Sequence, residues 1–257
     1  MDWNTYLDAI TADAKRLHDI ALSNPDLDLE TCPGWTVTDV VAHLGRIHRR
    51  TLDLVNEGLT DRFPDPVDAP ERDVVAWAGA AARDMVSALA GIDPTTPLYT
   101  WHTSNQTAGF WMRRMAHETA IHRLDAEIAV GDIVPFEREF AADCAAEVLE
   151  VLLTGCPPWG TWIPFDKVVY LACTDVEASW MLELGAFEGT SPTSGRHYEE
   201  LPGMEFVTGV DDPDVAITGP AHSLASWIWG RGSLATLDID GDLAVAMLFR
   251  SAAADAT

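Results

Sequence analysis

The stretch WMRRMAHETAIHRLDAEIAV, residues 111–130, decides the fold of the first half of this chain. Its apolar side chains recur at helical spacing and predict a helix over about 110–130, with a core stripe of Ile121, Leu124 and Ile128. A second stripe of the same helix carries Glu118 and His122. Residues four apart leave a helix on one face, with Cβ atoms about 5–6 Å apart. Their carboxylate and imidazole can therefore bind one metal ion.

Further helices are predicted in the same half, because apolar residues recur there three and four positions apart. They cover about 3–22, a segment that begins at Thr36, about 71–89, and about 136–153. The hydroxyl of Thr36 can cap its helix, and Asp39 three residues later makes the sequence close to a capping box. Helices of this length joined by short loops predict an antiparallel bundle, a fold that commonly holds metal sites between facing helices.

After Pro158 the hydrophobic pattern changes to that of strands and turns. Apolar or alternating runs predict strands at 168–173, 179–184 and 214–218, then a helix at about 221–229, and closing strands at 234–239 and 243–249 about an Asp240–Gly241 turn. Residues 185–213 predict a long surface loop or ribbon. We therefore expect an α+β protein of two domains. The first is an antiparallel four-helix bundle over 1–156, and the second is a small α+β domain with a mixed or antiparallel sheet over 157–257.

His43 is the third candidate ligand, on the flank of the apolar stripe of the helix that begins at Thr36. That helix can face the helix of Glu118 and His122 across a bundle, so the three side chains can meet at one divalent ion. Three protein ligands leave coordination positions open, which distinguishes catalytic metal sites from structural ones. The sequence therefore predicts an enzyme. Two histidines and a glutamate accept zinc, nickel, cobalt or iron.

Each candidate ligand also has an ordinary structural explanation. Glu118 can form an ion pair with Arg114, one turn earlier on the same face. A lone histidine at the edge of a core, such as His43, is more often hydrogen-bonded than metal-bound. Asp125, one turn after His122, can accept the second ring N–H of that histidine or can face solvent.

The neighbouring histidines are excluded from the site by their spacing. The segment from His117 to His122 has one residue too many for the H-E-x-x-H motif of zinc peptidases. At 3.6 residues per turn, His117 points about 140° away from His122, so the peptidase motif is excluded. His48 is five residues after His43 and points elsewhere for the same reason.

Composition and charge exclude several classes of function. With 41 acidic and 16 basic residues the net charge is −25, which opposes binding to nucleic-acid backbones and to anionic membranes. No apolar run is long enough to span a membrane, and no signal peptide is visible. The four cysteines predict no disulfide framework, and Cys32, in a Cys-Pro-Gly turn, is expected to shape the chain. We expect a cytoplasmic protein with neither nucleic acid nor membrane as partner.

Three segments resemble one known family. The first, CPGWTVTDVVAHL at 32–44, is similar to the N-terminal signature of the mycothiol-dependent maleylpyruvate isomerases, and 111–127 is similar to that family's second metal segment. Residues 217–231 resemble its C-terminal domain. The resemblance implies a DinB-like four-helix bundle joined to a sterol-carrier-like domain, with zinc bound by His43, Glu118 and His122. Arg231 is the best match to an arginine that helps to bind substrate or thiol, although an arginine at a helix end also neutralises backbone carbonyls.

The resemblance also implies a reaction. The chain would activate a low-molecular-weight thiol such as mycothiol as a zinc thiolate, which attacks a small electrophile. An adduct that rotates and expels the thiol gives cis–trans isomerisation, as in a maleylpyruvate isomerase, whereas a released adduct gives S-transfer. Two alternatives remain open: a metal-dependent hydrolase at the same site, and a non-catalytic, metal-stabilised module that binds small molecules.

Overall fold

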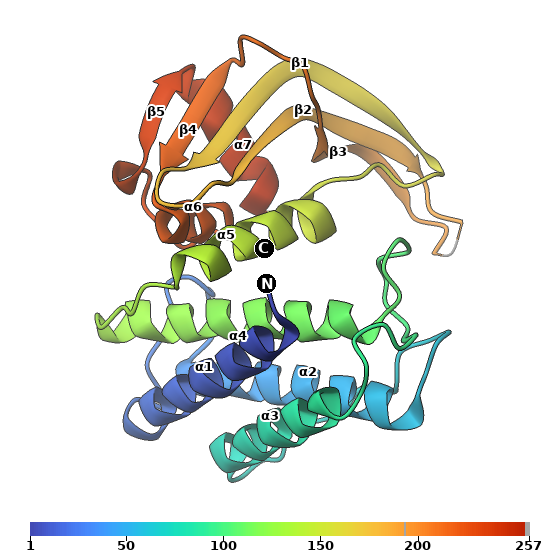
Figure 1. The fold of residues 1–257 in the computed structure, drawn as a ribbon, viewed down its shortest axis with the longest axis vertical. Coiled ribbons are helices and arrows are strands. Elements are labelled where there is room, and N and C mark those ends of the chain that lie inside the picture. The colour runs from blue at the N-terminus through green and yellow to red at the C-terminus, as the bar shows by residue number, and fades with distance from the viewer. Residues whose placement is uncertain (193, 255–257) are drawn as a thin grey trace. The chain divides into compact units, whose positions relative to one another are not determined.

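The structure is a computed structural model that describes residues 1–192 and 194–254 (Figure 1). It divides into two compact units, Met1–Val134 and Pro135–Thr257. The α+β class and the two-domain organisation expected from the sequence are confirmed. The division falls earlier than the boundary expected between residues 156 and 157, because the helix that follows residue 135 packs within the second unit.

The first unit is a helical bundle of α1 (Trp3–Ser23), α2 (Val37–Glu57), α3 (Val74–Ala90) and α4 (Ala108–Val130). These helices lie close to the ranges expected from their apolar spacing. Their buried side chains include a core cluster of Leu17, Ile20, Ala21, Leu29, Val37, Val40, Val41, Leu44, Ala78 and Ala126. Among the described residues, no helix combines the length and the apolar character needed to cross a membrane.

Local hydrogen bonds fix where α2 and α4 begin. The backbone N–H of Asp39 donates to Oγ1 of Thr36 over 3.3 Å, and the N–H of Thr36 donates to Oδ2 of Asp39 over 2.9 Å. This reciprocal pair is the capping box expected at the start of α2. Thr107 caps α4 in the same manner, through the N–H of Phe110. The caps therefore set the start of each helix and with it the direction in which later side chains point.

Helices α2 and α3 approach each other closely at Gly45. A Cβ atom at this position would lie 2.2 Å from Cζ3 of Trp77 and 3.0 Å from Cβ of Ala78. Because Gly45 has no side chain, the ring of Trp77 can pack directly against α2. Gly45 is buried, so the contact belongs to the interior of the bundle.

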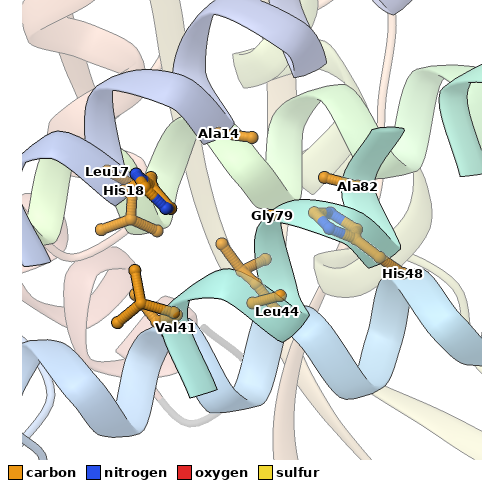
Figure 2. Close-up of a pocket in the computed structure, with 10 residues that line it drawn as sticks. Ala14, Leu17, His18, Val41, Leu44, His48, Gly79 and Ala82 are labelled. Carbon is orange, nitrogen blue, oxygen red and sulfur yellow. The ribbon is translucent and has the colours of Figure 1, made fainter. Parts of the chain in front are cut away.

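A small pocket lies between α1, α2 and α3 (Figure 2). Its volume is about 20 Å³, and its lining is mainly apolar, with Leu17, Val41 and Leu44 among the labelled residues. A cavity of this size has room for about one water molecule and not for a substrate. The ring of His48 borders the pocket, and its Nε2 bonds to Oγ1 of Thr119 on α4 over 2.9 Å.

The second unit begins with α5 (Arg138–Val148) and a π-helical turn (Leu149–Leu153). A five-stranded sheet follows, in the order β3-β2-β1-β4-β5, with α6 (Ala221–Ile228) and α7 (Leu243–Ala254). The strands are β1 (Gly160–Cys173), β2 (Ser179–Thr190), β3 (His197–Phe206), β4 (Val215–Gly219) and β5 (Asp238–Gly241). Because β1 pairs with β4 in parallel and the other neighbours are antiparallel, the sheet is mixed.

Helix α5 is part of the second unit and not of the helical bundle. The indole N–H of Trp229 donates to the carbonyl of Cys144 on α5 over 3.3 Å, and the N–H of Phe136 donates to Nδ1 of His222 on α6 over 3.1 Å. The sequence predicted this helix correctly as far as residue 153, but its apolar face did not reveal which unit would bury it.

Three expectations for the C-terminal half differ from the structure. The segment 185–213 was expected as a loop or ribbon, yet β2 continues into it and β3 occupies its centre. The closing strand expected at 243–249 is the helix α7. Its buried residues, Val245, Ala246, Phe249, Ala252 and Ala253, recur at three- and four-residue intervals, which is the helical period. The strand expected at 234–239 is a short 3₁₀ turn (Leu234–Thr236) followed by β5.

Candidate metal centre

The three predicted ligands come together between α2 and α4 of the first unit. Oε1 of Glu118 lies 3.1 Å from Nε2 of His43 and 3.4 Å from Nε2 of His122. One potential ligand atom from each residue lies within 4.8 Å of the other two. The rings of His43 and His122 meet edge to face, with centroids 5.0 Å apart. Both Nε2 atoms therefore face the same carboxylate oxygen.

The packing of α2 explains the position of His43. Val40, Val41 and Leu44 are buried in the bundle core, and this orientation leaves His43 on the flank of the helix that faces α4. The ring of Trp35, just before the start of α2, lies 5.1 Å from the ring of His43. The side chain of His43 keeps 28% of its surface exposed, against 14% for Glu118 and 11% for His122. Solvent therefore reaches the cluster mainly on the His43 side.

The carboxylate of Glu118 is ionised. Its Oε2 accepts a hydrogen bond from Nη2 of Arg114, one turn earlier on α4, as the sequence suggested. Burial alone would raise the pKa of Glu118, but the charge of Arg114 and the two histidine donors hold it well below 4.5. The ion pair with Arg114 uses one oxygen and leaves Oε1 directed at the two imidazoles.

The imidazole of His122 is held from both sides. Its Nδ1 lies 2.9 Å from Oδ2 of Asp125, while Nε2 faces Glu118. Burial would lower the pKa of His122, but hydrogen bonds to Asp125, Cys32 and Glu118 raise it well above 6.5. Asp125 is fully buried. Two roles were expected for Asp125. The structure shows the contact with His122 and excludes exposure to solvent.

The donor set fits a divalent cation. Two imidazole nitrogens and one carboxylate oxygen converge on a common space, and this combination is found in catalytic zinc sites. The contact between Nδ1 of His122 and Asp125 is the outer hydrogen bond that metal-binding histidines usually make. His43, Glu118 and His122 could therefore hold a metal.

The structure keeps three other histidines out of this cluster, as the spacing predicted for His117 and His48. His117 is fully buried, and its ring packs edge to face against Tyr6 at 5.9 Å. His48 is buried and bonds to Thr119. His102, in the loop before α4, bonds through Nδ1 to Ser104. None of the three belongs to a group of potential ligands among the described residues.

Sequence reasoning missed the position of Cys32. The residue does form part of the turn before α2, as expected, since its carbonyl accepts the N–H of Trp35 over 3.0 Å. Its Sγ also lies 3.4 Å from Oδ2 of Asp125, although 93 positions separate the two residues. A long-range contact of this kind has no periodic signal in the sequence, so only the folded chain reveals it.

Arg231 lies in the second unit, just after α6. Its backbone N–H donates to the carbonyl of Ser226 over 2.7 Å, and its Nη1 donates to the carbonyl of Trp229. The guanidinium thus neutralises carbonyls at the end of α6, which is the ordinary role suggested for it. Burial and the charge of Arg231 lower the pKa of Arg250 on α7. A role for Arg231 toward a substrate stays a proposal.

The fold and the cluster together define a two-domain α+β protein whose helical bundle carries a candidate metal centre of two histidines and a glutamate. Two family models cover most of the chain: the mycothiol maleylpyruvate isomerase N-terminal domain matches residues 7–127, and the corresponding C-terminal domain matches 139–247. The chain therefore belongs to the mycothiol-dependent maleylpyruvate isomerase family. The gap between the two matches contains the division at residues 134 and 135.

Solved structures of the same family share the fold. A mutant of the mycothiol-dependent maleylpyruvate isomerase, in which alanine replaces a histidine, superposes with a TM-score of 0.59 at 13% sequence identity. A second structure, titled as the mycothiol-dependent maleylpyruvate isomerase, gives 0.55 at 16% identity. Each match covers 95% of both chains. A search among curated proteins found no match. At these identities the likeness establishes the fold and leaves the reaction to be tested.

Proposed function

We propose that this chain is a metal-dependent enzyme that activates a low-molecular-weight thiol, of the mycothiol kind, for attack on a small electrophile. The observation that carries the proposal is the convergence of Nε2 of His43, Nε2 of His122 and Oε1 of Glu118 within 4.8 Å. Three protein ligands leave coordination positions for a further group. In a chain of this family, a thiol is the group to expect there.

The chain's own residues would hold and orient the metal centre. His43 and His122 would bind the ion through Nε2, and Glu118 through Oε1. Arg114 would fix the other oxygen of Glu118 and so keep the carboxylate turned toward the ion. The ion, zinc in this proposal, would supply the charge that deprotonates a coordinated thiol at neutral pH.

The surroundings of the ligands would control access. Trp35 packs beside His43, the most exposed of the three, and its large ring would narrow the path by which solvent and substrates reach the ion. Arg231 is proposed to bind a carboxylate of the electrophile, because a guanidinium and a carboxylate can form paired hydrogen bonds. If the adduct of thiol and electrophile expels the thiol, the product is an isomer. If the adduct is released, the reaction is an S-transfer.

Elemental analysis of the purified protein tests the metal centre. The full chain, prepared without chelator, should contain about one zinc or similar ion per chain, by analogy with catalytic sites of three protein ligands. The variant His43→Ala should lose the ion, while the control His102→Ala should retain it, since His102 bonds only within its own loop. A chain that neither contains nor binds a divalent ion would favour the non-catalytic binding module.

A thiol-dependence assay tests the reaction. The metal-loaded protein is incubated with monobromobimane, a generic electrophile, with and without mycothiol, and a parallel assay follows the isomerisation of maleylpyruvate. Catalysed consumption that needs both thiol and metal supports the proposal. Metal-dependent turnover of an electrophile without thiol would instead identify a hydrolase. Arg231→Ala should weaken catalysis without changing metal content, and Arg196→Ala, whose guanidinium packs on Tyr198, is the matched control.

A further inference from the structure

Behind the ligand His122 lies a pair of side chains that no motif assigns to the metal centre. We infer that Cys32 and Asp125 form a hydrogen-bonded pair that positions the imidazole of His122 for metal binding. Oδ2 of Asp125 lies 2.9 Å from Nδ1 of His122 and 3.4 Å from Sγ of Cys32. One carboxylate oxygen thus accepts from both the ring and the thiol. The inference rests on the proposed function, since it concerns the same site.

The chemistry of imidazole explains why this oxygen matters. A neutral histidine carries one N–H and one lone pair, and only the lone pair can bind a metal. When Nδ1–H donates to Asp125, the lone pair is on Nε2, the atom that faces Glu118 and His43. Asp125 therefore selects the tautomer of His122 that can bind an ion between α2 and α4. It also restrains rotation of the ring.

The thiol has its own part in this arrangement. Asp125 is fully buried, and a buried carboxylate requires hydrogen-bond donors. Cys32 is one donor, and its loop is fixed by backbone bonds, because the N–H of Cys32 donates to the carbonyl of Leu29 over 3.2 Å. The thiol therefore restrains the same Oδ2 of Asp125 that contacts Nδ1 of His122. In this way the turn before α2, which precedes His43, is connected to the ligand on α4.

The same side chains also allow an alternative metal site. Ligand atoms of Cys32, His122 and Asp125 also lie within 4.8 Å of one another, so these three could themselves bind an ion. His122 would then bind that ion through Nδ1. A neutral imidazole has only one such lone pair, so Nε2 could not also bind an ion held by His43 and Glu118. We favour the positioning role, because the set with His43 brings a second imidazole and keeps the hydrogen bond from Cys32 to the buried carboxylate of Asp125. The two arrangements predict opposite effects of single substitutions.

The experiment compares metal affinities of the full chain and its variants. Zinc dissociation constants are measured by competition with a chromophoric chelator for wild type, Asp125→Asn, Cys32→Ala and Cys32→Ser, and the absorption spectrum of the cobalt-loaded proteins reports ligand geometry. Asp125→Asn should weaken binding roughly 10–100-fold. Cys32→Ala removes one weak thiol hydrogen bond to Asp125 and should weaken binding roughly fivefold. Cys32→Ser keeps a donor and should recover most of that loss.

Controls separate positioning from general loss of stability. Cys173→Ala removes a thiol from the second unit and should leave the metal affinity unchanged. Thermal unfolding of the metal-free proteins identifies any variant that fails to fold, and the cobalt spectrum of Cys32→Ser still tests the inference in that case. A wild-type cobalt spectrum together with restored affinity in the serine variant supports positioning, whereas a changed spectrum would indicate that the sulfur of Cys32 binds the ion.

Two results would overturn the inference. If Asp125→Asn and Cys32→Ala both bind zinc as wild type does, the pair has no role toward the metal, although the metal centre itself stands. If Cys32→Ala loses the ion while His43→Ala keeps it, the thiol is a ligand. A wild-type chain that binds no ion at all would remove the proposed function instead, so the two failures are distinguishable.

Discussion

Nε2 of His43 lies 3.1 Å from Oε1 of Glu118, although 75 positions separate the two residues in the chain. The contact joins α2 to α4 and forms the centre of the candidate site. It exists because α2 buries an apolar stripe and leaves His43 on its flank, while α4, which is buried on most of its faces, presents Glu118 to that flank. The geometry of the bundle brings His43 to the carboxylate of Glu118, whereas His122 lies beside it one turn later on the same helix.

Two histidines on α4 should behave oppositely toward metal. His122→Asn should lose the ion, because it removes Nε2 from the cluster. His117→Asn should retain it, because that ring packs against Tyr6 in the core. Zinc content by elemental analysis, with circular dichroism to confirm folding, checks both. Loss of zinc in the His117 variant alone would contradict the assignment of ligands.

Gly45 should tolerate no side chain. Gly45→Ala places a methyl group 2.2 Å from Cζ3 of Trp77, so the ring or the α2–α3 contact has to shift. We expect a loss of about 1–3 kcal/mol in the free energy of unfolding, as for other overpacked cores. Chemical denaturation measures it. Gly91→Ala is the control, since its nearest neighbour would lie 3.4 Å away and its φ of −85° suits alanine. Equal stabilities of the two variants would refute the prediction.

The stability of the first unit should depend on pH through Asp13. Burial is the main cause that raises its pKa from 3.8 to about 6, although Nε of Arg123 donates to it over 3.1 Å. Between about pH 4 and pH 6 the folded state therefore binds more protons than the unfolded state. The stabilising contribution is complete below pH 4 and is lost as the pH rises through 6.

Asp13→Asn isolates this effect, because asparagine does not titrate. The difference in unfolding free energy between wild type and variant should change by roughly 3 kcal/mol across this window, with wild type losing stability as the pH rises. Denaturation of both proteins in the same chelator, at steps from pH 4 to pH 8, measures the difference and removes any contribution from metal release. A difference that is constant with pH would exclude the shifted pKa.

The start of α2 should contribute to both stability and metal binding. Thr36→Ala removes the oxygen that accepts the N–H of Asp39, and the loss should be about 1 kcal/mol in unfolding free energy. Because α2 carries His43, fraying of its first turns should also weaken zinc binding slightly. Thr36→Ser preserves the cap and serves as the control. If the alanine variant unfolds at the same denaturant concentration as wild type, the cap has no energetic role.

The sequence predicted the helices of the bundle well, because each carries a regular apolar stripe and clear end signals. The capping box at Thr36 and Asp39 was found in this way and is present in the structure. The last helix was mistaken for a strand. Its segment 243–249 is short and mostly apolar, and such a run does not distinguish strand from helix. The packing of this segment as α7 against β1, β3 and β4 decides its conformation.

The candidate site was predictable in part. Glu118 and His122 share a face because they are four residues apart, and that fact is local. The ion pair with Arg114 follows from the same rule. The burial of Asp125 and its contact with Cys32 are not local, since they depend on how the turn before α2 packs on α4. The sequence left Asp125 with two roles and gave Cys32 only a structural one.

The sequence alone thus determined the helical periods, the caps, the family and the pairing of Glu118 with His122, since each depends on neighbours along the chain. The tertiary structure decided which helices share a core, that α5 packs against α6 in the second unit, and that Asp125 and Cys32 lie behind a ligand. Burial and contacts between distant segments arise only when helices pack, and no spacing within one helix encodes the distance to another.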